Sequence, residues 1–257
     1  MKIICIANQK GGVGKTTTAI NLSASLAVAE KRTLLIDCDP QGNASSGLGV
    51  EKAAIREKSL YRALTGQMAF AEAVVGSPLP NLDVVPSDQD LIGVELEFIN
   101  IADREKQLRM QLSGFPGISK YDYVIIDCPP SLGLLTINSL VAADSLLVPL
   151  QCEYFAMEGL GMLLNTVRIV KARLNPPLNL AGILLTMFDS RNRLSHLVAE
   201  DVRKHFGSRV FHTVVQRNVR LSESPSHGLP VLLYDLKSRG AICYLELARE
   251  IMSNGRI

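Results

Sequence analysis

The chain lacks any apolar run close to the roughly 20 residues that a membrane-spanning helix needs. Its N-terminal apolar stretch, residues 3–7, is shorter than the core of a secretory signal, which takes about 7 to 15 residues, and polar residues follow it directly. The five cysteines are scattered, without the close pairs that disulfide frameworks or zinc sites use. We therefore expect a cytoplasmic, globular protein with reduced cysteines and no stable membrane insertion.

Aromatic residues are also scarce, at 5% of the chain, and tryptophan is absent. Proteins that read single-stranded nucleic acid stack bases on aromatic rings, so that class is disfavoured. The four histidines show no metal-ligand spacing, and the cysteines lack the arrangement of an iron–sulfur ATPase. We therefore assign no catalytic role to histidine and disfavour a metal-cluster carrier.

Charge is distributed unevenly, although the net charge is only +2. Residues 1–164 carry 13 basic and 18 acidic side chains, whereas residues 165–257 carry 14 and 7. A basic C-terminal third indicates an anionic partner, or, as the simpler alternative, a solvated basic surface.

At 257 residues the chain is long enough to bury one sizeable core, and no repeat or Pro/Ser-rich linker divides it. Nearly continuous β-branched runs alternate with helical patterns, which predicts a doubly wound α/β fold. We expect a single domain, residues 1–257, with a mostly parallel sheet and helices on both faces. The expected strands are residues 3–7, 33–36, 82–85, 123–126, 145–150, 180–186 and 210–215. The expected helices are residues 16–29, 91–100, 134–141, 157–174, 195–205 and 242–252.

A glycine-rich segment lies between the first expected strand and the first expected helix. Its backbone N–H groups, together with the positive end of the helix, form a cradle for a polyphosphate. Lys15 is placed to reach the β- and γ-phosphates, and the Thr16 hydroxyl to bind Mg²⁺. The pattern therefore predicts ATP and Mg²⁺ as cofactors, with the phosphates bound by Lys10, Gly11, Gly12, Val13, Gly14, Lys15, Thr16 and Thr17.

The loop departs from the usual P-loop pattern, which begins with glycine, because Gln9 occupies that position. Lys10 adds a second ammonium group, which accelerates the reaction only if it meets the developing negative charge and is otherwise a solvated lysine. The segment resembles the deviant Walker A box of the ParA/MinD group of P-loop ATPases. That resemblance implies that Lys10 reaches across a nucleotide-sandwich dimer to the phosphates of the partner chain.

Acidic residues follow two further expected strands. Asp37 and Asp39 come after the second expected strand, and Asp127 ends an apolar run typical of a Walker B strand. Ligands of open α/β sheets bind beyond the carboxyl ends of the strands, so these acids are candidates for the site, although either loop alone could use its acid as a cap. We expect Thr16, Asp39 and Asp127 around the Mg²⁺, with Asp37 near it, and Asp39 orienting the attacking water. With Lys10 and Lys15, Asp39 completes the candidate catalytic set.

The resemblance then narrows to chromosome-partitioning ParA proteins of the Soj type, over residues from about 2 to 252. It is carried by the segments 37–43, 127–133, 149–155, 217–228 and 234–240, which read DCDPQGN, DCPPSLG, PLQCEYF, RNVRLSESPSHG and YDLKSRG. It implies an ATPase that forms an ATP-dependent homodimer, binds double-stranded DNA non-specifically and associates with the nucleoid. A ParB-like partner protein would stimulate its hydrolysis, which we expect to be slow otherwise. Gln216 departs from the family, where proline commonly precedes Arg-Asn.

The basic surface provides candidates for DNA contact. Residues 165–220 contain ten Lys or Arg and three Asp or Glu, with few aromatics, a composition that fits contact with the backbone of duplex DNA. By resemblance, Arg217 and Arg220 are the first candidates for DNA contact, and Arg191 is a further one, with Arg193, Lys237 and Arg239. Arg217 and Asn218 could instead face the nucleotide. Met187, with Phe188, could flank the adenine or pack in the core.

Two other functions remain as alternatives. A MinD-like regulator that cycles on membranes would need a basic amphipathic tail, and residues 248–257 have few apolar anchors. A nucleotide switch without catalysis would have no use for Asp39 beside two lysines. We therefore expect an ATPase that drives chromosome or plasmid partitioning.

Overall fold

The computed structural model describes residues 1–253. Within these residues no helix combines the length and the apolar composition needed to cross a bilayer. The C-terminal tail, residues 248–257, bears on the membrane-cycling alternative, and its last four residues, 254–257, lie outside the described residues.

The described chain forms one eight-stranded sheet with the strand order β3-β4-β2-β5-β1-β6-β7-β8. All neighbouring strands pair in parallel except β3 and β4, which pair antiparallel. The strands are β1 Lys2–Ile6, β2 Thr33–Asp37, β3 Val75–Gly76, β4 Leu82–Val85, β5 Tyr123–Asp127, β6 Ser145–Gln151, β7 Asn179–Phe188 and β8 Val210–Gln216. The central strand β1 lies between β5 and β6, so the loop that follows it opens at the crevice where α/β folds bind ligands.

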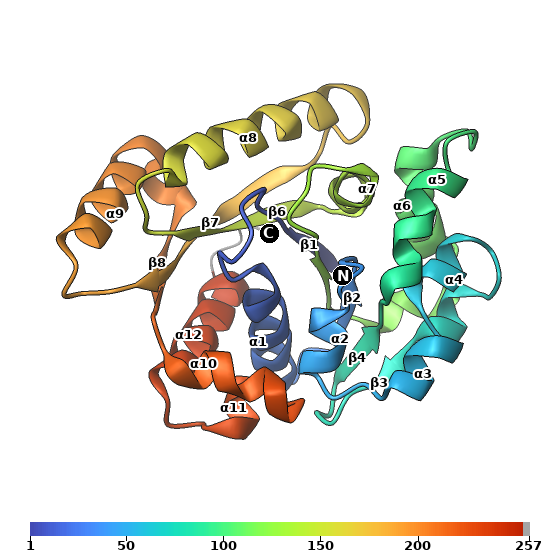
Figure 1. Cartoon of the computed structure of the whole chain (residues 1–257), viewed down its shortest axis with the longest axis horizontal. Helices are drawn as coiled ribbons and strands as arrows, with labels where there is room; N and C mark the ends of the chain where they lie inside the picture. The colour runs from blue at the N-terminus through green and yellow to red at the C-terminus, as the bar shows by residue number, and fades with distance from the viewer. Residues whose placement is uncertain (254–257) are drawn as a thin grey trace.

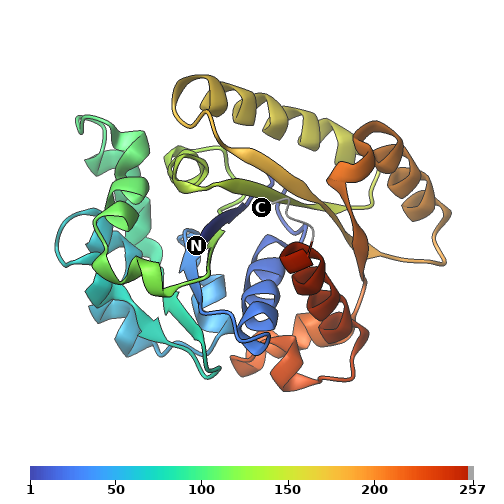
Figure 2. The same cartoon turned by 180° about the vertical axis from the view of Figure 1, so that it is seen from behind.

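Helices cover both faces of this sheet (Figure 1). They are α1 Lys15–Val28, α2 Asn43–Gly47, α3 Lys52–Glu57, α4 Leu60–Leu64, α5 Gly93–Glu97, α6 Gln107–Ser113, α7 Leu134–Ala142, α8 Ala156–Arg173, α9 Arg193–Phe206, α10 Val219–Glu223, α11 Val231–Tyr234 and α12 Arg239–Ser253. Buried apolar residues form two clusters, one on each face, because the strands are apolar on both sides. Helices α1 and α12 lie side by side on one face (Figure 2).

The predicted fold class is confirmed, and all seven predicted strands are present. The helix predicted at residues 91–100 is shorter than expected, because a 3-10 helix η2, Gln89–Ile92, precedes a single turn of α5. The short helices α2, α3, α4, α6, α10 and α11 and the two-residue strand β3 were not predicted. Elements this short carry too few residues to show a hydrophobic period.

The segment after β2 packs tightly against a distant part of the chain. Gly49 and Gly228 both have positive φ, at +71° and +65°, and a Cβ on Gly228 would lie 2.8 Å from the Cα of Gly49. Gly228 follows the 3-10 helix η6, Ser224–His227, whose Pro225 lies beside Gly47. The two glycines therefore allow the backbones of α2 and η6 to touch.

We predict that Gly228→Ala lowers the free energy of unfolding by about 3 kcal/mol, because it adds both backbone strain and a backbone clash. Gly66→Ala is the matched control, since Gly66 also has a positive φ, +74°, but no atom within 4 Å of its Cβ position. That control should cost only about 1 kcal/mol. Urea unfolding measures both, and equal losses in the two variants would mean that the contact between Gly49 and Gly228 has no energetic weight.

Candidate nucleotide-binding site

The phosphate loop follows β1 and ends at the first turn of α1. Gly12 and Gly14 have φ values of +74° and +89°, which side chains disfavour, and Gly14 is the residue that precedes the helix. The Thr186 hydroxyl of β7 donates to the Val13 carbonyl oxygen at 2.8 Å. Strand β7 thereby holds the loop in place. The first backbone N–H groups of α1 remain available to bind an anion.

Lys15 is buried at the base of this loop, with 6% exposure. Its Nζ donates to the carbonyl oxygen of Lys10 at 3.0 Å, which folds the lysine across the loop. Burial lowers the pKa of Lys15, and the nearby carboxylates of Asp127 and Asp39 oppose that shift. A bound polyphosphate would give this partly desolvated ammonium a stronger acidic partner than it has in the free chain.

Asp127 ends β5 and is fully buried, and neither of its carboxylate oxygens has a hydrogen-bond partner among residues 1–253. Burial raises its pKa well above the ordinary range, the charge of Asp37 adds to the rise, and the Thr16 hydroxyl opposes it. A buried carboxyl group without a partner carries its charge only when a cation lies beside it. Asp127 and Thr16 therefore fit a Mg²⁺ ion, which binds through one or two protein oxygens, phosphate oxygens and water. The described residues contain no group of three His, Cys, Asp or Glu side chains able to hold a metal, and Mg²⁺ bound to a nucleotide requires none.

Asp37, the last residue of β2, and Asp39, two residues later, have different surroundings. The fully buried Asp37 accepts from the backbone N–H of Ser45 at 2.8 Å and from its hydroxyl at 2.7 Å. Burial raises its pKa to about 6, although the bonds from Ser45 oppose the rise. Asp39 is 7% exposed and accepts from the backbone N–H of Gln41 at 3.0 Å. Asp39 lines the phosphate cavity and Asp37 does not, so the structure separates a carboxylate that faces the ligand from one that holds the loop.

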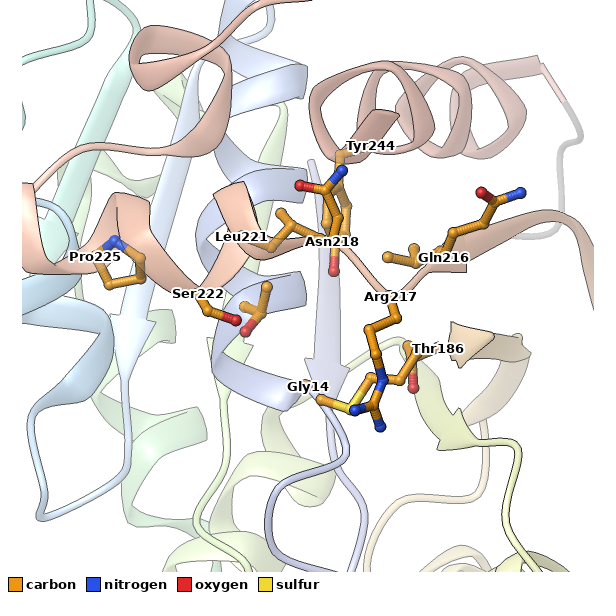
Figure 3. A pocket seen from close by; sticks show the side chains of 12 residues that line it. Gly14, Thr186, Gln216, Arg217, Asn218, Leu221, Ser222, Pro225 and Tyr244 are labelled. Atoms are coloured by element: carbon orange, nitrogen blue, oxygen red, sulfur yellow. The ribbon is translucent and has the colours of Figure 1, made fainter. Parts of the chain in front are cut away.

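Two cavities meet at the phosphate loop. One, of about 400 Å³, is lined by Gly11, Gly12, Gly14, Lys15, Thr16, Thr17, Asp39, Gln41, Asn43, Pro130 and Met187. The other, of about 380 Å³, is lined by Gly14, Thr17, Thr186, Met187, Val215, Gln216, Arg217, Asn218, Leu221, Ser222, Pro225 and Tyr244 (Figure 3). They share Gly14, Thr17 and Met187, so the cavity that contains Lys15 and Asp39 adjoins a second cavity of similar size, as the phosphates and the base of a nucleotide require.

The second cavity contains the predicted base-binding residues. Met187, Arg217 and Asn218 all line it, and Arg217 extends toward Gly14 in Figure 3. Met187 has a φ of +50°, a strained value that is typical of functional positions. Phe188 instead meets the His196 ring edge-on, with centroids 5.0 Å apart, and packs against the core. The sequence left open whether these two residues flank the adenine or pack in the core. Met187 lies at the cavity, whereas Phe188 packs against the core.

Lys10 does not line the phosphate cavity of its own chain. Its Nζ lies 2.5 Å from Oε2 of Glu153, and both side chains are nearly half exposed. Gln151 also donates a hydrogen bond to Glu153. Lys10 is therefore held at the surface beside the loop rather than over it.

The candidate DNA contacts do not form one free cluster. Arg191 is bound to Asp189 by two hydrogen bonds, and this pairing lowers the pKa of Asp189 to about 2. Arg220 pairs with Glu223 at 2.8 Å and with Asp235 at 3.3 Å. Exposed pairs like these are weak, so each arginine can exchange its carboxylate for a DNA phosphate.

Several residues of the site could not be identified from sequence patterns. Thr186 holds the loop, Ser45 holds Asp37, and Tyr244 closes the base cavity while its hydroxyl lies 3.1 Å from that of Thr18. Glu153, the partner of Lys10, lies in the segment 149–155 that carries the family resemblance. The family resemblance of residues 149–155 was the one sequence feature that could have pointed to Glu153.

Comparison with known proteins identifies the family. Residues 1–180 match the family described as an AAA domain. The chromosome partitioning protein ParA of Myxococcus xanthus is 57% identical over 98% of this chain and 88% of its own length. The sporulation initiation inhibitor protein Soj of Bacillus subtilis is 54% identical over 99% of both chains. A solved structure from Mycobacterium smegmatis, described as cobyrinic acid a,c-diamide synthase with an ATP analogue and magnesium, has a TM-score of 0.85 at 36% identity, covering 100% of this chain and 98% of its own.

The raised pKa of Asp37 predicts a specific dependence of stability on pH. The folded chain binds the proton of Asp37 more tightly, with a pKa of about 6, than the unfolded chain. The stability that this group contributes is therefore fully present at about pH 4 and lost as the pH rises through 6. Relative to Asp37→Asn, the wild-type protein should lose about 2 kcal/mol of unfolding free energy between pH 4 and pH 6.

Urea unfolding of the nucleotide-free protein in EDTA measures this difference. Asp90→Asn is the matched control, because it removes the same carboxyl group from an exposed position. A difference between wild type and Asp37→Asn that does not change with pH would contradict the assignment.

Proposed function

The chain belongs to the AAA-domain family and, within it, to the ParA and Soj chromosome-partitioning proteins. On that premise we propose that it is an ATP-driven switch for DNA partitioning. ATP and Mg²⁺ are its cofactors, and ATP hydrolysis is its reaction. The observation that carries the proposal is the meeting of the two cavities at the phosphate loop. Lys15, Thr16 and Asp39 line one of them, and Asp127 is buried close to Lys15 and Thr16.

Each polar side chain has a role in γ-phosphoryl transfer to water. Lys15 and the loop amides bind the phosphates, and Thr16 and Asp127 hold the Mg²⁺, which neutralises phosphate charge when bound. Asp39 lies at the edge of the cavity, where its carboxylate orients a water for attack. Hydrolysis of this kind depends on positioning, so we expect turnover to be slow until DNA and a ParB-like protein complete the site.

Lys10 supplies the link to dimer formation. Its side chain does not line the phosphate cavity of its own chain and is held by a half-exposed carboxylate, a pairing worth no more than about 1 kcal/mol. In the proposed ATP-bound homodimer, Lys10 leaves Glu153 and approaches the phosphates of the partner chain. Two chains joined in this way would double the basic surface that each contributes.

DNA binding is proposed to be non-specific and to involve the phosphate backbone. Arg191, Arg217 and Arg220 are all exposed. Arg217 lines the base cavity as well, so its segment is placed to respond to the nucleotide. Association with the nucleoid in the cytoplasm would follow from such binding.

The experiment that tests the function is binding of random-sequence duplex DNA by Asp39→Ala. This variant should bind ATP and dimerise but fail to hydrolyse ATP, which holds the protein in one state. Fluorescence anisotropy should show DNA binding with ATP and not with ADP. The affinity should fall at least about tenfold between 50 and 200 mM salt, because phosphate contacts release counterions.

Lys15→Ala is the control, since without that ammonium the variant should bind neither ATP nor, in consequence, DNA. Absence of DNA binding by Asp39→Ala with both nucleotides would contradict the partitioning switch. Binding of ATP-loaded protein to anionic liposomes in place of DNA would instead favour the MinD-like alternative.

Substitution of Lys10 tests the dimer separately. Lys10→Ala should bind ATP with nearly wild-type affinity, because its side chain does not line the phosphate cavity, but should remain monomeric by light scattering. Lys171→Ala on α8 removes an exposed lysine elsewhere and should still dimerise with ATP. Normal dimerisation of Lys10→Ala would exclude the cross-chain role.

A further inference from the structure

Asp189, the first residue after β7, holds the guanidinium group of Arg191. The Nε and Nη2 atoms of Arg191 donate to Oδ1 and Oδ2 of Asp189 at 3.1 and 3.0 Å, and the backbone N–H of Arg191 donates to Oδ1 at 3.0 Å. The Asp189 side chain is 28% exposed and that of Arg191 is 88% exposed. The pair thus has the two-bond geometry in which surface pairs are most stable, yet a phosphate can reach the arginine and replace the carboxylate.

A second arginine lies near the same carboxylate. The hydrogen bonds from Arg191 lower the pKa of Asp189 to about 2, and the charge of Arg217 adds to that shift. Arg191 and Arg217 are two of the three arginines that we propose for DNA contact. Asp189 is therefore an acid that two of these candidate contacts share.

The pair between Asp189 and Arg191 has no net charge. Duplex DNA gains affinity when free cations of a protein replace its condensed counterions, and a cation that is already neutralised contributes little. A DNA phosphate that approaches Arg191 is also repelled by the neighbouring carboxylate. Asp189 consequently competes with phosphate for the arginines of its own chain.

The nucleotide cavities lie beside this carboxylate. Met187, two positions before Asp189, lines both cavities, and its φ of +50° is a strained value that its surroundings impose. The backbone N–H of Arg217 donates to the carbonyl oxygen of Phe188 at 3.1 Å, which joins the base cavity to the residue before Asp189. The Arg217 side chain itself extends toward Gly14 (Figure 3). A nucleotide that fills both cavities would therefore contact Met187 and Arg217, whose positions determine where Asp189 lies.

We propose that Asp189 is an autoinhibitory residue that occupies Arg191 and screens Arg217 in the nucleotide-free chain, and that a bound nucleoside triphosphate weakens this hold. DNA then meets two free arginines in place of a neutral pair. The identity of the polyanion as DNA rests on the proposed function, whereas the competition between Asp189 and a polyanion does not.

The test removes the charge of Asp189 and keeps its shape. In Asp189→Asn the side-chain oxygen can still accept from the Arg191 backbone N–H, so the local turn is retained. Without nucleotide, fluorescence anisotropy should show random-sequence duplex DNA bound at least about tenfold more tightly than by the wild-type chain. The plot of log affinity against log salt should steepen by about 0.9 for each arginine released.

Asp201→Asn is the matched control. It removes one carboxylate from an exposed position on α9, where Asp201 pairs with His205. Its DNA affinity should differ from wild type by less than about twofold, because salt screens charges that are not in contact. The double variant Asp189→Asn/Arg191→Ala should lose most of the gain, because the released arginine is absent. Thermal unfolding checks that each variant is folded.

Two measurements do not depend on DNA. Asp189→Asn should elute from a heparin column at higher salt than wild type and Asp201→Asn, because heparin is a polyanion of a different kind. NMR titration of the nucleotide-free chain should give Asp189 a pKa of about 2. Arg191→Ala should raise that pKa toward the ordinary value of about 4.

An ATP analogue that is not hydrolysed tests the link to the nucleotide. It should raise the DNA affinity of the wild-type chain and change that of Asp189→Asn much less, because the variant has no carboxylate to displace. The analogue itself should bind equally well to both proteins, since Asp189 lines neither cavity.

Unchanged or weaker DNA binding by Asp189→Asn would overturn the proposal, and weaker binding would mean that Asp189 orients Arg191 for DNA. An equal gain in Asp201→Asn would reduce the effect to net charge. An equal gain with and without the analogue would exclude the nucleotide link. If no variant binds DNA in any nucleotide state, the partitioning function is refuted, and the heparin and pKa measurements still decide whether Asp189 competes for the arginines.

Discussion

The fully buried carboxylate of Asp127 is the constraint on which the site depends. It ends the central strand β5, and the described residues provide no hydrogen bond to either oxygen. Such a group carries its charge only where a cation compensates it, and the nearby side chains that favour its charge are Lys15 and the hydroxyl of Thr16. Free Lys15 is itself partly desolvated. The chain without ligand therefore lacks the partners that Mg²⁺ would give Asp127 and that a polyphosphate would give Lys15, and binding is favoured because it supplies them.

The two cavities unite segments that are far apart in the sequence. The phosphate loop, the end of β7 and the end of β8 converge because the parallel strands all finish at the same edge of the sheet. The contact between Gly49 and Gly228 then joins the loop after Asp39 to the segment after Asn218. Packing at that distance leaves no space for an intervening side chain. The phosphate end and the base end of the site are consequently parts of one packed unit.

The sequence predicted the fold and the phosphate loop because both depend on local patterns. Seven strands could be identified from their apolar runs, and residues 10–17 combine glycine, lysine and threonine at fixed spacing. The roles of Ser45 and Thr186 could not be predicted in this way, because a serine or threonine gains its function from a partner that only the fold brings near. The partner of Lys10 was equally hidden, since 143 positions separate it from Glu153. Short elements such as α2 and α10 form through tertiary contacts rather than through periodicity.

In the proposed dimer, the pairing of Lys10 with Glu153 would let each chain respond to the nucleotide of its partner. An exposed lysine–carboxylate pair contributes little, so under this proposal Lys10 would leave Glu153 once a stronger anion is within reach. A triphosphate with bound Mg²⁺ still carries more negative charge than one carboxylate, and it gains further charge density in the transition state. Loss of the γ-phosphate removes much of that attraction, while Glu153 remains in place to recover the lysine. In the proposed dimer, association then depends on whether the Lys10 ammonium group pairs with Glu153 or with the phosphates of the partner chain. Hydrolysis would reverse the association without any large rearrangement of the fold.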